Sequence, residues 1–422
     1  MKNYAKELLV FIDNSPTAFH AVKTIEDELL SSNFIQLLEN KSWEIEANKK
    51  YYVKRDDASI ITFITPKKIT ENSLFKIIGA HTDSPCLKIK SNPTSTREGY
   101  QMLNCEIYGG VLLNSWFDRD LNFGGRVFIE DENGNLRMEL VKFDFKIRIP
   151  RLAIHMDRGV NNEGFKPNPQ DQMFPTIGLG ENVNFEKLIQ QRLQTKDNVL
   201  SWDIFLFDTE KSSFGGMKEE FIYAPRLDNL SSVHASLTAL KESSVHDTDI
   251  IMTSFFHHEE VGSQSQNGAG SNFQEATLKR INSALNRTDM ELYATLSKSF
   301  FISADMAHAT HPNYSNLHDP NHKPSMNKGP VIKSNGNERY ASNAYSIAKF
   351  KQWCNNAKVP FQNFNIRNDM GCGSTIGPMT ASKLGIPTID IGNPMLSMHS
   401  IREMCGTADH EMIIKVFKEF FR

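Results

Sequence analysis

Four apolar segments of this sequence are each followed by side chains that can bind a divalent metal ion. These side chains are, in chain order, His81 and Asp83, Glu259 and Glu260, Asp305, and His399. Histidine, aspartate and glutamate are ligand types that zinc and similar ions prefer in proteins. Ligands of open α/β sheets bind beyond the carboxyl ends of the strands, so these side chains are expected to meet at one edge of a sheet. The pattern favours the hypothesis of a metal-dependent hydrolase.

The spacing of these residues indicates how they could divide the work. Residues two apart in a strand face the same way, so Asp83 can accept a hydrogen bond from the ring of a metal-binding His81. Glu259 and Glu260 would point in different directions in an extended chain, so one can bind metal while the other acts as a general base. Asp228 precedes a predicted helix and could bridge two ions about 3.5–4 Å apart.

Purely structural roles stay open for the same residues. A histidine after a strand is more often a hydrogen-bonded residue than a ligand, and adjacent glutamates are usually solvated. Asp228 can instead cap the helix that follows it. The sequence has no His-Glu-x-x-His and no Gly-x-Ser-x-Gly motif. The glycine-rich loop 371–377 lacks the lysine of a phosphate-binding loop, and Cys372 within it is only a minor candidate for a nucleophile.

Helix and strand patterns alternate in two parts of the chain. Strands are predicted at residues 59–65, 75–80, 249–256, 299–304, 361–366 and 388–391, and helices within residues 1–45 and at residues 230–240, 341–353, 375–384 and 411–421. This alternation predicts an α/β fold with a mixed central sheet flanked by helices.

Between about residues 92 and 218 the pattern changes to short segments of alternating hydrophobicity. These segments are residues 106–112, 126–129, 136–141 and 143–149, and they are separated by turn sequences that contain glycine and asparagine. We therefore predict a β-rich domain at residues 92–218. It would be inserted into an α/β domain that comprises residues 1–91 and 219–422.

Composition limits the expected partners and compartment. The 422 residues contain 47 Lys and Arg against 50 Asp and Glu, a net charge of −3, which argues against nucleic-acid binding through bulk electrostatics. No run of about 18 apolar residues predicts a membrane span, and the N-terminal residues do not resemble a secretory signal. The five scattered cysteines, without a Cys-x-x-Cys motif, favour a cytoplasmic location.

Five ordered motifs closely resemble those of the M18 metallopeptidases, the aspartyl aminopeptidase family. They are Gly79-Ala80-His81-Thr82-Asp83-Ser84-Pro85, Arg226-Leu227-Asp228-Asn229-Leu230, His258-Glu259-Glu260-Val261-Gly262-Ser263, Ser303-Ala304-Asp305-Met306-Ala307-His308-Ala309 and Met398-His399-Ser400-Ile401-Arg402-Glu403. Shorter matches occur at residues 151–156, 329–333 and 339–344. The resemblance implies a zinc-exopeptidase fold and an aminopeptidase that hydrolyses the N-terminal residue from peptides.

The resemblance also implies a site for two zinc ions. The implied ligands are His81, Asp228 and Asp305 for one ion and Asp228, Glu260 and His399 for the other, with Asp228 as the bridge. Glu259 is implied as the general base that takes a proton from a metal-bound water, and Asp83 as the partner of His81. Manganese or cobalt at one site stays open, because histidine and carboxylate ligands accept several divalent ions.

Self-association is a further implication of the resemblance. In this family the inserted domain builds subunit contacts, and the members resemble one another in forming dodecamers, here expected to be built from dimers. The position that matches His155 reaches into a neighbouring subunit. His155 is therefore implied to act on substrate in that neighbour's site.

The resemblance favours peptides that carry a free N-terminal Asp or Glu. A pocket for a carboxylate needs a cation, and Lys333 matches the family's candidate position, while Tyr340 lies in another matching block and is a second candidate for substrate binding. The family's Asn-Asp-Thr-Pro-Cys-Gly is replaced here by Asn368-Asp369-Met370-Gly371-Cys372-Gly373. This departure leaves a neutral, Leu-type preference open.

Two other functions compete with this one. A non-catalytic peptide-binding relative is expected to have lost one of the five ligands or the base, and all six residues are present. Deacylation of small amides by the same metals is disfavoured by the insert and by the block at residues 398–403.

Overall fold

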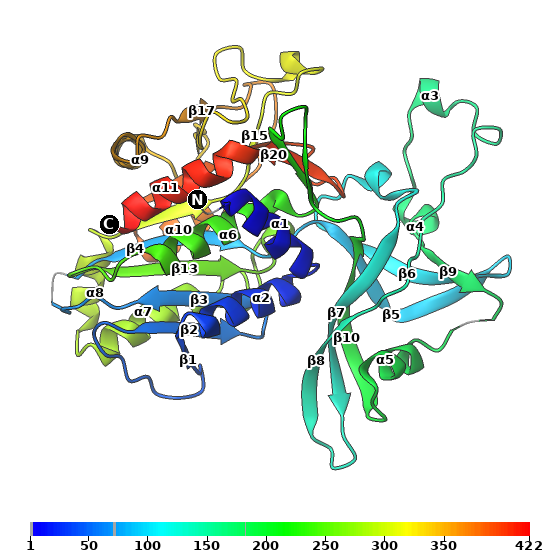
Figure 1. The fold of residues 1–422 in the computed structure, drawn as a ribbon, viewed down its shortest axis with the longest axis horizontal. Helices are drawn as coiled ribbons and strands as arrows, with labels where there is room; N and C mark the ends of the chain where they lie inside the picture. The colour runs from blue at the N-terminus through cyan, green and yellow to red at the C-terminus, as the bar shows by residue number, and fades with distance from the viewer. Residues whose placement is uncertain (1–2, 71–72, 182) are drawn as a thin grey trace.

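The structure is a computed structural model that describes residues 3–70, 73–181 and 183–422. It has two lobes (Figure 1). In the larger lobe helices cover a central sheet, and the smaller lobe is mostly β. No helix in the described ranges is long and apolar enough to cross a membrane.

The central sheet of the larger lobe is mixed, as predicted. Its nine strands lie in the order β1 (Ile35–Leu37), β2 (Lys50–Arg55), β3 (Ser59–Ile64), β13 (Ile250–Phe256), β4 (Phe75–His81), β14 (Phe300–Ala304), β18 (Thr388–Gly392), β16 (Val331–Lys333) and β17 (Gln362–Phe364). Strands β13, β4, β14 and β18 run parallel to one another. Their carboxyl ends therefore lie at the same edge of the sheet, and each is followed by one or more of the predicted site residues.

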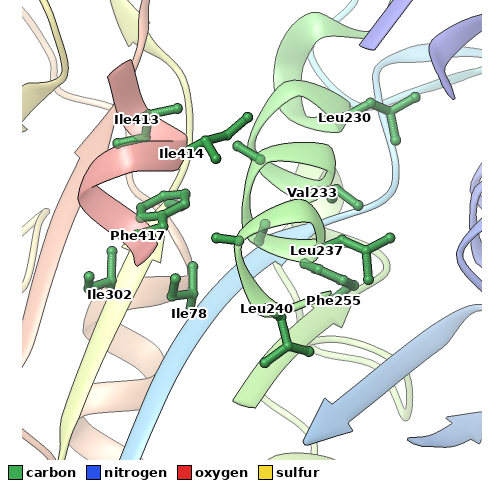
Figure 2. Packing of buried hydrophobic residues seen from close by; sticks show 14 of the residues in the cluster. Ile78, Leu230, Val233, Leu237, Leu240, Phe255, Ile302, Ile413, Ile414 and Phe417 are labelled. Carbon is green, nitrogen blue, oxygen red and sulfur yellow. The ribbon is translucent and has the colours of Figure 1, made fainter. Parts of the chain in front are cut away.

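Helices cover both faces of this sheet because successive residues of a strand point to opposite sides. One face packs against α1 (Tyr4–Asn14), α2 (Ala18–Ser31), α6 (Leu227–Glu242), α9 (Ala344–Asn356) and α11 (Thr407–Phe421), and the other against α7 (Phe273–Ala284), α8 (Asp289–Leu296) and α10 (Ile376–Leu384). In β4, Ile78 belongs to the first core and Ile77 to the second. Figure 2 shows Ile78 and Ile302 beside Phe417 of α11. The strands that lead to the site are thus packed on both sides.

The smaller lobe contains a six-stranded antiparallel sheet with its own core. Its strands lie in the order β8 (Leu136–Lys142), β7 (Leu121–Glu130), β10 (Asn198–Asp208), β5 (Cys86–Arg97), β6 (Tyr100–Tyr108) and β9 (Thr176–Leu179). Its short helical segments are η1 (Leu113–Trp116), α3 (Val160–Glu163), α4 (Pro169–Gln172) and α5 (Phe185–Leu193). The chain enters this sheet at Cys86, before residue 92. The division into domains at residues 92 and 218 stays a prediction.

A third, five-stranded sheet lies beside the central one. It consists of β11 (Ser213–Gly215), β12 (Phe221–Ala224), β20 (Glu403–Gly406), β19 (Pro394–Leu396) and β15 (Ala307–His308). The loop between β19 and β20 carries His399. Two further turns of 3-10 helix, η2 (Glu259–Val261) and η3 (Ser315–Leu317), complete the regular structure of the described residues.

Two predicted segments differ from the structure. Residues 1–45 were expected to be helical, but after α2 the chain forms strand β1 at Ile35–Leu37. Residues 143–149 form isolated bridges and no continuous strand. Phe143, Ile147 and Ile149 are buried in the core of the smaller lobe. Their spacing therefore reflects burial and not regular strand pairing.

Candidate active site

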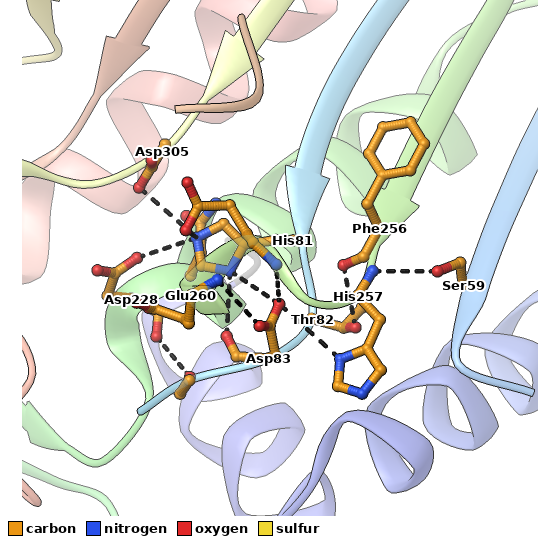
Figure 3. Close-up of polar contacts among 12 residues, drawn as sticks. Ser59, His81, Thr82, Asp83, Asp228, Phe256, His257, Glu260 and Asp305 are labelled. Carbon is orange, nitrogen blue, oxygen red and sulfur yellow. Dashed lines mark hydrogen bonds and ion pairs between the residues drawn. The ribbon is translucent and has the colours of Figure 1, made fainter. Parts of the chain in front are cut away.

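His81 is the last residue of β4 and lies at the centre of the site (Figure 3). Its side chain is 1% exposed. The Nε2 atom lies 3.4 Å from Asp228 Oδ1, 3.8 Å from Asp305 Oδ1 and 3.9 Å from Glu259 Oε2. The Nδ1 atom lies 3.1 Å from the backbone oxygen of Asp83 and 3.5 Å from its Oδ1. With the Nδ1 proton directed at Asp83, Nε2 is the nitrogen that faces the other carboxylates, and it could bind a metal ion once it is deprotonated.

Asp228 lies between the two predicted histidine ligands. Its Oδ1 is near His81, and its Oδ2 is 3.5 Å from Nε2 of His399. The backbone is fixed on both sides, because Ser84 Oγ donates to the carbonyl of Asp228 at 2.6 Å and the Asp228 N–H donates to Glu403 Oε2 at 3.0 Å. Asp228 is the second residue of α6, where the backbone departs from helical geometry with φ −82° and ψ 104°. Its two carboxylate oxygens face His81 and His399, which favours metal binding over a helix cap.

Glu259 and Glu260 belong to a turn and not to an extended chain. His258 adopts a left-handed backbone with φ 63°, and the chain enters η2 immediately after β13. The N–H groups of Glu259 and Glu260 donate to Asp83 Oδ1 and Oδ2 at 3.2 and 3.1 Å. Both carboxylates face the site, and Glu260 Oε2 lies 3.3 Å from Nε2 of His399. The different directions expected for an extended chain therefore do not apply, because the strand ends before these residues.

A cavity of about 450 Å³ opens in front of these residues. Its lining comprises Asp228, Glu259, Glu260, Gly262, Ser263, Asp305, Met306, His308, Lys333, Tyr340, Gly373, Ser374, Thr375, Met379, Met398 and His399. Lys333 ends β16 and is 3% exposed, with Nζ 3.8 Å from Asp305 Oδ2 and 5.4 Å from the centre of the Tyr340 ring. Gly373 belongs to the loop at residues 368–373, whose sequence differs from that of the family, and it lines the cavity. Met370 and Gly371 of the same loop are outside the lining.

Three groups at the site were not predicted. Glu403 is 3% exposed and accepts hydrogen bonds from the N–H groups of Asp228 and His399, at 3.0 and 2.8 Å. Tyr108 donates to Asp83 Oδ2 at 2.7 Å, and the carbonyl of Gly110 lies 3.0 Å from His399 Nδ1. Glu403 stands within a quoted motif, which could have drawn attention to it. Nothing in the local sequence marks Tyr108 or Gly110.

The pKa shifts follow from burial and crowding of like charges. Burial raises the pKa of Glu259 to about 8, and Asp305 adds to the shift against the opposing effect of His81. Burial and the neighbouring Asp228 raise the pKa of Glu260 well above its ordinary value. Burial alone would lower the pKa of His81, but the nearby carboxylates of Asp228, Asp305 and Asp83 raise it well above its ordinary value. The site is therefore strongly acidic in character, and cations stabilise its charged form.

The donor set fits divalent ions. His81, Asp228 and Asp305 form one trio, and Asp228, Glu260 and His399 form another, with ligand atoms within 4.8 Å of one another in each. A third trio contains His81, Glu259 and Glu260. Asp228 Oδ1 and Glu260 Oε1 are buried and have no hydrogen-bond partner among the described residues. Buried carboxylate oxygens without a donor are costly unless a cation or water meets them.

His155 lies outside this cluster. It is exposed in a turn of the long connection between β8 and β9, which projects from the smaller lobe (Figure 1). Its apolar neighbours Leu152, Ile154 and Met156 are 57%, 48% and 75% exposed. Within one chain the structure therefore brings together all the other predicted site residues and leaves His155 apart.

Comparison with known proteins defines the class. The family model described as "Aminopeptidase I zinc metalloprotease (M18)" matches residues 11–421. The protein is thus a zinc metallo-aminopeptidase, with the hydrolase activity and the α/β fold that were predicted. The chain belongs to the M18 family.

Relatives and solved structures support this assignment over the whole chain. The chain is 44% identical over 434 residues to "Probable M18 family aminopeptidase 2" of Clostridium novyi (strain NT), with 100% of both chains covered. It is 43% identical over 423 residues to the protein of that name from Pseudomonas aeruginosa (strain UCBPP-PA14), with 98% of this chain and 97% of the relative covered. A chain in the cryo-EM structure of the Ape4 and Nbr1 complex has a TM-score of 0.94 and 39% identity, over 99% of this chain and 85% of that one. The S. cerevisiae mApe1 dodecamer has a TM-score of 0.87 and 28% identity, over 99% of this chain and 96% of that one.

Proposed function

We propose that this aminopeptidase holds two zinc ions and uses Glu259 as its general base. One ion would be held by His81, Asp228 and Asp305, and the other by Asp228, Glu260 and His399. The observation that carries the proposal is that these two trios share Asp228 and place their ligand atoms within 4.8 Å of one another. The unpartnered buried oxygens of Asp228 and Glu260 support it further.

The chain's own residues account for the proton transfers of peptide hydrolysis. Bound zinc would polarise the peptide carbonyl and lower the pKa of a coordinated water. Glu259 accepts a proton from the attacking water as its oxygen bonds to the carbonyl carbon, and returns it to the leaving amine when the C–N bond breaks. Asp83 holds the N–H groups of Glu259 and Glu260, which keeps both carboxylates directed at the cavity. The carboxylates that line the cavity would also bind the positively charged amino terminus of the substrate.

The side-chain preference is proposed to be acidic. Lys333 lines the cavity beside Asp305, and the carboxylate of an N-terminal Asp or Glu could pair with its ammonium group. Tyr340 lies beside Lys333 and would close the same subsite. Met379 and Met398 also line the cavity, and this apolar wall is the observation that favours the alternative, a Leu-type preference.

Self-association is proposed on the exposed setting of His155. The apolar side chains around it are of the kind that subunit interfaces cover, and the similar mApe1 structure is a dodecamer. We place His155 in a neighbour's cavity, where it would contact substrate. The five cysteines are free, which fits the proposed cytoplasmic location.

A peptide panel tests the function. Peptides that begin with Asp, Glu, Leu, Ala and Lys are incubated with the full-length protein, with and without a chelator, and again after zinc is restored. Chelator-sensitive release of Asp and Glu is expected. Release of Leu alone would refute the proposed acidic preference but would still support the metal site. No release of any residue from the zinc-restored protein would favour a non-catalytic peptide binder.

Lys333→Met sharpens the panel. The variant keeps an unbranched side chain that is one atom shorter and removes its charge. The kcat/KM for Asp peptides should therefore fall about tenfold to a hundredfold, the range for a hydrogen bond to a charged group. Cleavage of Leu peptides should be retained. The matched control is Lys415→Met, because Lys415 is an exposed lysine of α11.

A further inference from the structure

A short segment of the smaller lobe reaches into the site of the larger lobe. Strand β6 ends at Tyr108, whose hydroxyl donates to Asp83 Oδ2 at 2.7 Å. Two residues later, the carbonyl of Gly110 lies 3.0 Å from His399 Nδ1. Asp83 in turn lies beside Nδ1 of His81, at 3.5 Å. One segment therefore contacts the ring partner of one histidine and the ring of the other.

These contacts select the form in which each histidine can bind metal. A carbonyl oxygen only accepts hydrogen bonds, so the contact with Gly110 requires the proton of His399 on Nδ1. The Nε2 lone pair is then left facing Asp228 and Glu260. For His81, the acceptors of Asp83 likewise place the proton on Nδ1 and free Nε2. A second hydrogen bond of this kind fixes both the tautomer and the ring orientation of a metal-binding histidine.

The loop that carries His399 is held by the same segment. His399 has a left-handed backbone, with φ 66°, which a non-glycine residue adopts only when its surroundings enforce it. The N–H of Leu112 donates to the His399 carbonyl at 3.1 Å, and the N–H of Ile401 donates to Ser115 Oγ at 3.0 Å. The backbone of Gly110 lies close to the His399 ring, because a Cβ atom on Gly110 would be only 3.1 Å from His399 Nδ1.

We propose that residues 108–115 are a positioning segment of the metal site, which sets the tautomer and orientation of His399 directly and of His81 through Asp83. This inference rests on the proposed metal-binding function. It gives the smaller lobe a role in retaining metal within its own subunit, apart from any contact between subunits.

Zinc affinity tests the proposal in the full-length protein. Tyr108→Phe and Gly110→Ala are each titrated with zinc in competition with a chromophoric chelator, and the melting temperature of the metal-free form is measured alongside. The matched controls are Tyr100→Phe, at an exposed position of the same strand, and Gly336→Ala, where an added Cβ meets no atom within 4 Å. Gly110→Ala keeps the carbonyl but adds a Cβ atom that must displace the His399 ring, and Tyr108→Phe removes the donor to Asp83. We expect affinity to fall about 10- to 100-fold in each variant, the usual effect of disturbing the groups that orient a metal ligand.

The possible results separate clearly. The proposal would be overturned if Tyr108→Phe and Gly110→Ala bound zinc as tightly as the controls do. It would also be overturned if their melting temperatures fell while their zinc affinity stayed unchanged. If Gly110→Ala does not fold, Ser115→Ala takes its place, because it removes the acceptor of the Ile401 N–H without altering the backbone. Wild-type protein that binds no zinc through these residues would instead refute the proposed function on which the inference rests.

Discussion

Individual side chains around His81 decide the charge balance of the site. The carboxylates of Asp228, Glu259 and Asp305 all lie within 4 Å of its Nε2 atom, and partial burial weakens the screening of their charges by water. In the metal-free chain burial raises the pKa of Glu259 to about 8, and bound divalent cations would lower it again, which leaves the carboxylate able to accept a proton near neutral pH. A group with that property, directed into the cavity, suits general-base chemistry.

Glu259→Gln tests this role. The amide keeps the shape of the side chain but cannot accept the proton of water, so turnover should fall by about 10² to 10⁴, the usual worth of a general base. Zinc content should stay near that of wild type, because the proposed ligands are unchanged. Turnover is measured as kcat, and zinc content is measured by metal analysis. Turnover close to wild type would remove Glu259 as the base, and loss of zinc would make it a ligand, as the third trio allows.

The same residue predicts a pH dependence for the metal-free protein. The pKa of Glu259 rises from 4.5 to about 8 in the folded chain, first through burial. The folded state then binds the proton more tightly than the unfolded state, so the contribution to stability is complete below pH 4.5 and is lost as the pH rises through about 8. In chelator, the melting temperature of wild type should therefore fall more between pH 5 and about 8 than that of Glu259→Gln. Parallel profiles for the two proteins would contradict this account.

At the scale of elements, the parallel strands β4, β13, β14 and β18 carry the site because both of their faces are packed. Every residue of β13, β14 and β18 is buried, and helices cover both sides. Phe417 of α11 is 0% exposed and lies beside Ile78 and Ile302. Ile78 precedes His81 in β4, and Ile302 lies in β14, which ends directly before Asp305. The packing of α11 against these strands therefore holds the proposed ligands His81 and Asp305 in position.

Phe417→Ala tests this support. Removing a buried phenylalanine side chain typically costs about 3–5 kcal/mol. The melting temperature should fall by several degrees in the metal-free and zinc-loaded forms alike, because the cavity is created in the core and not at the metal site. Lys415→Ala in the same helix, at an exposed position, should melt as wild type does. A loss equal in both variants would contradict this account, because alanine is a better helix former than either residue and only Phe417→Ala removes core packing.

At the scale of the molecule, the two lobes divide the work. The larger lobe supplies the predicted ligands and the base, and the smaller lobe supplies Tyr108, Gly110 and the projecting connection with His155. In our proposal this connection completes the site of another subunit. The active unit would then be an oligomer.

Paired variants test completion between subunits. His155→Phe alone should lower activity and leave zinc content unchanged. When His155→Phe and Glu259→Gln chains are assembled together, the former keeps its own base and receives His155 from the latter, so part of the activity should return. Sizing chromatography checks that mixed oligomers form. Mixed oligomers no more active than the average of the two separate variants would show that His155 does not act in a neighbour's site.

The sequence alone determined the types and order of the proposed ligands, the mixed α/β sheet and the M18 resemblance, because apolar strands and the residues that follow them are local patterns. Only the tertiary structure decided that Asp228 lies between two histidines, that Glu259 and Glu260 share a turn, and that Glu403 holds two ligand backbones. The contact between Gly110 and His399 joins residues 289 apart, across two lobes. Hydrogen bonds at that separation depend on how whole sheets pack together, and no local pattern of residues encodes them.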